Sequence, residues 1–332
     1  MAMKESGIEW VGSIPDTWDV IPNKYIMHKE KNLCEKWTGE DVMSLTMNGV
    51  IVRDLQNPTG KMPATFDGYQ YIEDGDLLMC LFDIDVTPRC IGKVTHNGVT
   101  SPAYSNFKTH DNASRDYYYY YYLMVDNTKE LLHLAKNLRH SFTEEQLGSL
   151  KVPMPPLTEQ QVIADYLNEK CSKIDDIIAE ANASVEEYKE LKQAVIDNAT
   201  MTGIHDSEMK YTDYVWFPEM PKSWNLVLAS LLFREDVRPI DANDVSLSLS
   251  QVDGLIPTDD MSERSLKSAT HDNWKHVIPD DLVLNRFKGH LGVFFASKYT
   301  GMVSFHYGVY HAIRDDVYAK YYEYLFHSTT YK

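Results

Sequence analysis

A heptapeptide near the start of the chain returns, with small changes, in its second half. Residues 14–20 read IPDTWDV and residues 220–226 read MPKSWNL, with tryptophan at the fifth position of each. Further blocks repeat in the same order, pairing 44–49 with 248–254, 73–78 with 278–283, 98–101 with 301–304, and 117–123 with 318–325. Because the order is kept throughout, the sequence predicts one duplicated domain.

Length and composition fit two modest domains and a connector. The 332 residues exceed the size at which a single hydrophobic core usually stops growing. Hydrophobic residues make up 43% of the chain, which is ample for packed cores. No run of 18 apolar residues occurs, and the N-terminal residues lack a basic segment followed by an apolar one. We therefore expect a soluble cytoplasmic protein.

Charge and cysteine usage exclude several classes of protein. The net charge of −17 argues against a protein that grips nucleic acid unaided, because such affinity comes mostly from Lys and Arg on phosphates. Any nucleic-acid role needs a local basic patch or a basic partner. Cys34, Cys80, Cys90 and Cys171 include no C-x-x-C pair, so we expect buried reduced thiols in place of a metal site or a disulfide framework.

The segment between the two copies predicts a long helix. The prolines of residues 153–156 (PMPP) terminate the preceding secondary-structure element. Thr158 with Gln161 then has the spacing of a capping box. The pattern stops near Gly203, which gives a rod of roughly 60 Å. Apolar residues recur at alternating steps of four and three, and the predicted seam consists of Leu167, Cys171, Ile174, Ile178, Ala181, Val185, Tyr188 and Val195. An ordinary core helix is the alternative, but the narrow apolar stripe favours a coiled-coil spacer with a partner helix.

The sequence pattern of each copy predicts strands and turns. Short apolar runs at 44–52 and 76–82 predict strands, and 91–94 with 96–99 predict a hairpin around an Asn-Gly turn. An amphipathic helix is expected to follow, with Leu131, Leu132, Leu134, Ala135 and Leu138 on its apolar side. The predicted fold class is α+β, with a mainly antiparallel sheet in each copy. The predicted domains are 1–155, a spacer helix at 156–203, and 204–332.

Three blocks carry a resemblance to a known family. They are residues 7–18 (GIEWVGSIPDTW), 155–167 (PPLTEQQVIADYL) and 170–175 (KCSKID). In these blocks the chain resembles the specificity subunit of type I restriction-modification systems, in which two target recognition domains alternate with two conserved helical regions. The resemblance implies a DNA-reading subunit without cofactor or chemistry of its own. It also implies two kinds of partner: modification subunits that methylate adenine at N6 using S-adenosylmethionine, and restriction subunits that use ATP and Mg²⁺.

The second copy departs from that family pattern. By the register of the repeat, the closing strand of the second copy and the second spacer helix are expected to be absent, as in a chain truncated within its second target recognition domain. In the family the second helix packs antiparallel on the first. The seam would then lack its partner within the chain, and self-association through the spacer helix is expected.

The residues themselves supply no motif for catalysis. We find no G-x-x-x-x-G-K-[ST] phosphate loop, no G-x-G-x-x-G after a strand, and no Asp/Asn-Pro-Pro-aromatic block of an amino-methyltransferase. The twelve histidines show no metal-ligand spacing. Asp83 and Asp85 near Asp74 and Asp76 could form a carboxylate cluster for a metal, although acids of turns and edge strands are the favoured interpretation. We expect no catalytic, cofactor or metal residues.

Candidate DNA contacts gather in equivalent stretches of the two copies. Cations, aromatics and a carboxamide could pair with phosphates and base edges there. The candidates are Arg89, Lys93, Tyr104, Asn106 and Lys108 in the first copy, and Arg286, Lys288, His290, Lys298, His306 and Tyr307 in the second. Arg53 to Lys61 is a further candidate loop. The tyrosine run 117–122 could stack on bases, but packing is the favoured role.

The sequence thus favours a non-catalytic, sequence-specific DNA-binding subunit. Two recognition domains held apart by a rod would read a bipartite target in double-stranded DNA and would scaffold the methyltransferase and restriction subunits. The alternative is an interaction or adaptor protein without DNA binding that pairs through its coiled-coil helix. An enzyme with a hidden active site is the least favoured interpretation.

Overall fold

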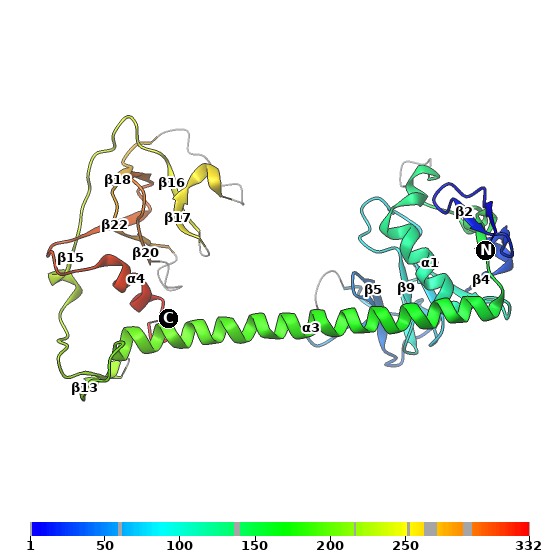
Figure 1. The fold of residues 1–332 in the computed structure, drawn as a ribbon, viewed down its shortest axis with the longest axis horizontal. Helices are drawn as coiled ribbons and strands as arrows, with labels where there is room; N and C mark the ends of the chain where they lie inside the picture. The colour runs from blue at the N-terminus through cyan, green and yellow to red at the C-terminus, as the bar shows by residue number, and fades with distance from the viewer. Residues whose placement is uncertain are drawn as a thin grey trace. The chain divides into compact units, whose positions relative to one another are not determined.

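The computed structural model describes residues 2–58, 62–135, 140–215, 217–250, 253–261, 271–287 and 294–331. Contacts divide the chain into two units, residues 1–178 and 179–332. The helix α3 (Leu157–Thr202) begins in the first unit and ends in the second (Figure 1). Its 46 residues make it about 70 Å long. The predicted long helix is therefore confirmed. Among the described residues, no helix combines the length and apolarity needed to cross a membrane.

Unit 1 (residues 1–178) combines short strands with two helices besides α3. Its strands are β1 (Met3–Glu5), β2 (Ser13–Pro15), β3 (Asp19–Pro22), β4 (Met27–Glu30), β5 (Val42–Thr46), β6 (Gly49–Val52), β7 (Gln70–Ile72), β8 (Leu77–Met79), β9 (Ile91–Lys93), β10 (Gly98–Thr100), β11 (Ser105–Thr109) and β12 (Lys151–Met154). The helices are α1 (Arg115–Asn127) and α2 (Glu144–Ser149), and 3-10 turns cover Asn23–Tyr25 and Glu130–His133.

Two four-stranded sheets form the body of unit 1. Their strand orders are β6-β5-β10-β7 and β4-β11-β8-β9. Two small sheets, β1-β2 and β12-β3, flank them. All the strand pairs described in this unit are antiparallel except β5 with β10, so the predicted α+β class with mainly antiparallel sheets is confirmed.

The predicted Asn-Gly hairpin is wrong. β9 pairs with β8, whereas β10 pairs with β5 and β7 in the other sheet. Gly98 is needed for close packing and not for a turn, because a Cβ there would lie 2.4 Å from the carbonyl oxygen of Asp41. The short segment between β9 and β10 thus changes sheets.

The helix predicted around residues 131–138 is also wrong. The helical segment of this region is α1, which lies earlier and contains the tyrosine run, and a 3-10 turn covers Glu130–His133. Leu138 lies outside the described residues. The side chains of Tyr117, Tyr118, Tyr121 and Tyr122 are buried in the main hydrophobic core, where α1 packs beside β9 (Figure 1). The packing interpretation of the tyrosine run therefore holds for these four residues.

Unit 2 (residues 179–332) repeats the strand texture of unit 1. Its strands are β13 (Met209–Tyr214), β14 (Phe217–Pro221), β15 (Phe233–Glu235), β16 (Leu247–Ser250), β17 (Gly254–Pro257), β18 (Lys275–Val277), β19 (Leu282–Asn285), β20 (Phe294–Ala296), β21 (Gly301–Val303) and β22 (Tyr307–Ala312). The helix α4 spans Ala319–Phe326, and 3-10 turns cover Ala229–Leu231 and Thr258–Asp260. The four-stranded sheet β15-β22-β19-β20 corresponds to β4-β11-β8-β9.

Local hydrogen bonds repeat between the units, which supports the duplication. The buried carboxylates of Asp76 and Asp281 each accept a bond at 2.9 Å from the backbone N–H three residues earlier. At another repeated position, the side chains of Gln70 and Lys275 each donate to a backbone carbonyl, that of Tyr104 at 2.8 Å and that of Tyr307 at 2.7 Å. Gly301 also repeats the close packing of Gly98, since its Cβ would lie 2.3 Å from the carbonyl oxygen of Val245.

Among the described residues, one edge of unit 2 differs from its counterpart in unit 1. In unit 1, β3 follows Trp18 and pairs with β12. The equivalent segment after Trp224 is in no strand, and no pairing with another described residue covers it. Leu226, Val227 and Leu228 are 43%, 48% and 72% exposed there.

Candidate nucleic-acid interface

Asn106 cannot read bases from its place in this fold, which corrects the sequence-based expectation. It lies in β11, the strand between β4 and β8, and is 1% exposed. Its Nδ2 donates a hydrogen bond to Oδ2 of Asp76 at 2.6 Å. The carboxamide therefore satisfies a buried carboxylate and is structural.

Lys108, on the same strand, faces two carboxylates. Its Nζ lies 2.9 Å from Oε2 of Glu73 and 3.4 Å from Oε2 of Glu30. The hydrogen bond that its Nζ donates to Glu73 raises the pKa of this lysine. Tyr104 is half-buried against the small cluster of Met43, Ile72, Leu78 and Val94. Both candidates thus have partners in unit 1 that compete with DNA.

Arg89 and Lys93 flank Tyr119 on one side of α1. The Nζ of Lys93 lies 5.7 Å from the centre of the Tyr119 ring and 3.4 Å from Oδ1 of Asp116. Burial raises the pKa of Tyr119, and the positive charge of Arg89 partly opposes that shift. Arg89 is half-buried, and no carboxylate of the described residues forms an ion pair with it. It is therefore the more available cation of the pair.

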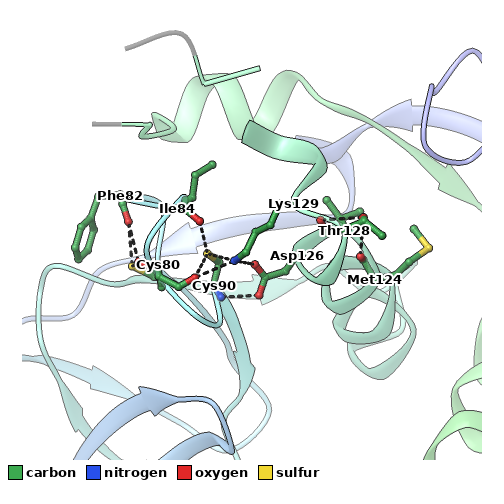
Figure 2. A network of polar contacts seen from close by, with 10 residues as sticks. Cys80, Phe82, Ile84, Cys90, Met124, Asp126, Thr128 and Lys129 are labelled. Carbon is green, nitrogen blue, oxygen red and sulfur yellow. Dashed lines mark hydrogen bonds and ion pairs between the residues drawn. The ribbon is translucent and has the colours of Figure 1, made fainter. Parts of the chain in front are cut away.

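A polar network fixes the loop that carries Arg89 (Figure 2). The Oδ2 of Asp126 accepts a bond from the backbone N–H of Cys90 at 2.6 Å, and its Oδ1 contacts Nζ of Lys129 at 2.8 Å. Lys129 also donates to the carbonyl of Thr87 at 2.8 Å. Because Thr87 and Cys90 bracket Arg89, Asp126 and Lys129 fix the backbone from which the Arg89 side chain extends.

In unit 2 a single carboxylate serves two cations. The Oε1 of Glu235 accepts a hydrogen bond from Nζ of Lys275 at 2.9 Å and another from Nη2 of Arg286. Lys275 is 6% exposed, whereas the Arg286 side chain is 46% exposed. Glu235 can neutralise only one of these two positive charges, and Arg286 is the more exposed of the two cations. Sequence reasoning missed Lys275, because a buried lysine resembles a surface lysine in a strand pattern.

The remaining candidates of unit 2 differ in their environment. Lys298 is exposed, and Tyr307 is half-buried with a pKa raised by burial. His306 is exposed and lies between two aromatic rings that the sequence analysis did not single out, those of Phe287 and Phe305. Lys288 and His290 lie outside the described residues, as does Lys61 of the alternative loop.

The predicted seam of α3 is open to solvent along most of its length. In unit 1, Leu167 and Cys171 are half-buried, whereas Ile174 and Ile178 are 56% and 52% exposed. In unit 2, Ala181 is exposed, and the larger seam residues are 49% to 71% exposed, namely Val185, Tyr188 and Val195. Leu191 is 58% exposed as well. Burying such a stripe against a partner helix is the usual way to stabilise it.

The start of α3 is anchored by the glutamine and glutamate of the PPLTEQ stretch. Gln160 is fully buried, with its Oε1 accepting from Ser114 N at 2.8 Å and its Nε2 donating to the Pro155 carbonyl at 2.8 Å. The capping box predicted at Thr158 and Gln161 is not what begins the helix. The helix starts one residue earlier, and Gln161 donates to Asp165. A capping box does form at Thr143 and Gln146, where α2 begins.

Metal ligation finds no support in the parts of the chain that the structure describes, where no group of three or more His, Cys, Asp or Glu side chains converges. Asp85 forms an ion pair with His140 at 3.2 Å, and Asp83 adopts a positive φ of 46° in a turn. Asp76 is bound to Asn106. The carboxylates of Asp76 and Asp85 therefore have separate local partners.

Comparison with known proteins shows which family this scaffold resembles. Residues 84–187 match the family described as type I restriction modification DNA specificity domain. The resemblance to the type I specificity subunits is confirmed. The matched segment includes Arg89, α1, β12 and the first part of α3, which are the elements that build the anchored loop and the helix junction. It supports a specificity subunit, the non-catalytic component of these systems.

One solved structure supports the fold. A chain in a structure that concerns complex assembly and conformational transition of the type I R-M system has a TM-score of 0.61 at 12% identity, with 95% of this chain and 80% of that chain covered. The HsdS subunit from Thermoanaerobacter tengcongensis gives 0.49 at 13%, covering 96% and 82%. The type I S subunit from M. genitalium gives 0.36 at 10%, covering 94% and 77%. Only the first of these three scores carries weight for the fold. No curated protein sequence matches.

Proposed function

We propose that this chain is the DNA-reading specificity subunit of a type I restriction-modification complex in the cytoplasm. Each duplicated unit would bind one half of a bipartite target in double-stranded DNA. The observation that carries the proposal is the match of residues 84–187 to a DNA specificity domain, combined with a second unit that repeats the local structure of the first. A continuous helix between two readers would fix the spacing of their half-targets.

The charges of the described residues indicate where DNA would lie. Arg89 and Lys93 in unit 1, and Arg286 and Lys298 in unit 2, are the cations best placed for phosphates. The net charge of −17 means that these few cations cannot hold DNA alone. Methyltransferase subunits would supply the remaining positive surface, as they also supply the adenine N6 chemistry.

The exposed seam of α3 is the proposed contact for those partners. A partner helix would bury Ile174 and Ile178 in unit 1, and Val185, Tyr188 and Leu191 in unit 2. Modification subunits are the proposed occupants, restriction and translocase subunits would join the complex they form, and a second copy of this chain is the competing occupant. A charge at Ile178 would disfavour any of these helical contacts, because an unpaired carboxylate would be buried.

The experiment is to express the chain with its methyltransferase and to map methylated adenines in DNA at single-base resolution. A bipartite motif that disappears when this chain is omitted is expected. Binding of the complex to a duplex carrying that motif should weaken steeply with salt. Methylation without any sequence pattern, or a complex that forms but binds no DNA, would instead support the adaptor function. Ile178→Asp should abolish co-purification with the methyltransferase, whereas Asp176→Ala on the same helix should not.

A further inference from the structure

Three aromatic rings gather on exposed loops of unit 2. The ring centre of His306 lies 5.0 Å from that of Phe287 and 3.9 Å from that of Phe305. We call Phe287, Phe305 and His306 the aromatic cluster. Phe287 is 71% exposed and Phe305 is 52% exposed. Two exposed phenylalanines in contact with one imidazole form an apolar surface that the described residues of unit 2 leave open to solvent.

Hydrogen bonds fix the two turns that carry these rings. Phe305 and His306 occupy the corners of a tight turn closed by the Tyr307 N–H donating to the Ser304 carbonyl at 3.1 Å. The backbone N–H of Phe287 donates to Oδ1 of Asn285 at 3.0 Å, which fixes the turn after β19. The cluster is therefore a positioned feature of two loops at the ends of neighbouring strands β19 and β22.

Unit 1 shows that the turn does not need aromatic residues. Its equivalent turn is closed by the Tyr104 N–H donating to the Ser101 carbonyl, also at 3.1 Å, and has Pro102 and Ala103 at the corners. Proline and small residues are the usual choice for such corners. Because the fold forms the same turn without them, the rings of Phe305 and His306 serve something other than the turn.

The surroundings of the aromatic cluster carry surplus positive charge. Arg286 precedes Phe287 directly, and its backbone N–H donates to the His306 carbonyl at 3.4 Å. As described above, Arg286 shares the Glu235 carboxylate with Lys275, and among the described residues no other carboxylate forms an ion pair with either cation. An apolar wedge beside an exposed guanidinium is suited to a stacked base next to a phosphate.

We propose that the aromatic cluster inserts at a base step of the half-target read by unit 2 and unstacks it, with Arg286 on the adjacent phosphate. The inference rests on the proposed function and adds a reading mechanism to it. The preferred step is a pyrimidine–purine step, because such steps unstack most easily. Unit 1 retains only Phe82 on the corresponding loop, where it is 37% exposed. The distortion is therefore confined to one half of the target.

The test uses the full chain in complex with its methyltransferase and a duplex carrying the mapped target. 2-Aminopurine replaces, one at a time, each adenine of the unit-2 half-target other than the methylated one. A several-fold rise in fluorescence at one step is expected with the parent. The double variant Phe287→Ala/Phe305→Ala should lose that rise and weaken binding about tenfold or more. Tyr318→Ala is the matched control, since this exposed aromatic of unit 2 lies outside the cluster, and it should behave as the parent does.

A second duplex separates insertion from simple contact. An abasic site at the responsive step is already unstacked, so it should restore much of the affinity that the double variant loses. The parent could bind its target specifically while the double variant shows the same affinity and the same fluorescence rise as the parent. That result would refute insertion by the aromatic cluster and leave the proposed function standing. A double variant that loses co-purification with the methyltransferase but retains the fluorescence rise would make the cluster a protein contact, which also refutes the wedge. A parent complex that binds no DNA overturns both.

Discussion

The indole Nε1 of Trp18 donates a hydrogen bond to Oε2 of Glu159 at 3.0 Å. This bond joins the repeated heptapeptide to the first turn of α3. The Trp18 ring also meets Tyr117 edge-on at 6.5 Å, and Trp224 repeats that contact with Tyr321 at 6.2 Å. In each unit the repeated tryptophan thus contacts a helical tyrosine, Tyr117 of α1 in unit 1 and Tyr321 of α4 in unit 2.

Gln160→Ala should destabilise unit 1 by about 1–3 kcal/mol, because it strips hydrogen-bond partners from buried backbone groups of Ser114 and Pro155. Gln161→Ala is the control, since that neighbour is exposed and should change the free energy of unfolding by less than about 0.5 kcal/mol. Urea denaturation with hydrogen exchange of α1 measures both. Equal effects would show that the buried amide does not anchor the helix.

Asn106→Ala should reduce stability and leave specificity unchanged. The substitution deprives the buried carboxylate of Asp76 of its 2.6 Å partner, at a cost of about 1–3 kcal/mol. In unit 2 the corresponding carboxylate of Asp281 is bound by Arg238, so the partner differs while the need for one persists. The methylated motif should be identical to that of the parent. A relaxed position in the motif would return Asn106 to the reading surface.

Cys90 should make unit 1 sensitive to alkali. Burial raises the pKa of its thiol from 9.0 to about 12. Between these values the unfolded thiol is ionised while the folded one keeps its proton, so the folded state binds more protons. The free energy of unfolding therefore falls as pH rises through this window.

Comparing variants isolates that contribution. Cys90→Ala should flatten the fall above pH 9, whereas Cys171→Ala, a half-buried residue of α3, should not. Thermal unfolding at pH 8 and at pH 10 measures the difference. Buried tyrosines of α1 also have raised pKa values, and they remain in both variants, so their effect cancels. Parallel curves for Cys90→Ala and the parent would contradict the prediction.

The sequence predicts the large-scale organisation well because that organisation rests on long patterns. The duplicated units share blocks in order, and the apolar period of α3 persists over many turns. Predictions of single turns and short helices fail where one tertiary contact overrides the local conformational propensity of the sequence. Asn97-Gly98 resembles a hairpin turn, yet Gly98 is there because the Asp41 carbonyl approaches too closely for a side chain.

The candidate interface is less predictable for the same reason. Asn106 is buried, whereas Arg89 is only half-buried. The spacing of residue types in the sequence does not reveal this difference in burial. Lys275 and Gln70 fill equivalent buried positions, one charged and one neutral. Each donates to a backbone carbonyl, and Lys275 also has the carboxylate of Glu235 as a partner. Phe287 and Phe305 become notable only once the fold places them together on the surface.

Arg89 and Lys108 should respond differently when DNA binding is measured against salt. Arg89→Gln should lower the slope of log affinity against log salt by about 0.9, since each phosphate contact contributes roughly that much. Lys108→Gln should leave the slope unchanged, because Glu73 and Glu30 already neutralise this lysine at 2.9 and 3.4 Å. Its affinity should still fall slightly, as two carboxylates lose their counter-charge.

The measurement is a titration of the methyltransferase complex on the mapped duplex at several salt concentrations, with a scrambled duplex for comparison. Because a phosphate contact carries no sequence information, Arg89→Gln should weaken binding to both duplexes alike. A slope lowered by Lys108→Gln and not by Arg89→Gln would move the DNA path of unit 1 from the α1 side of the sheet to the edge formed by β11 and β4.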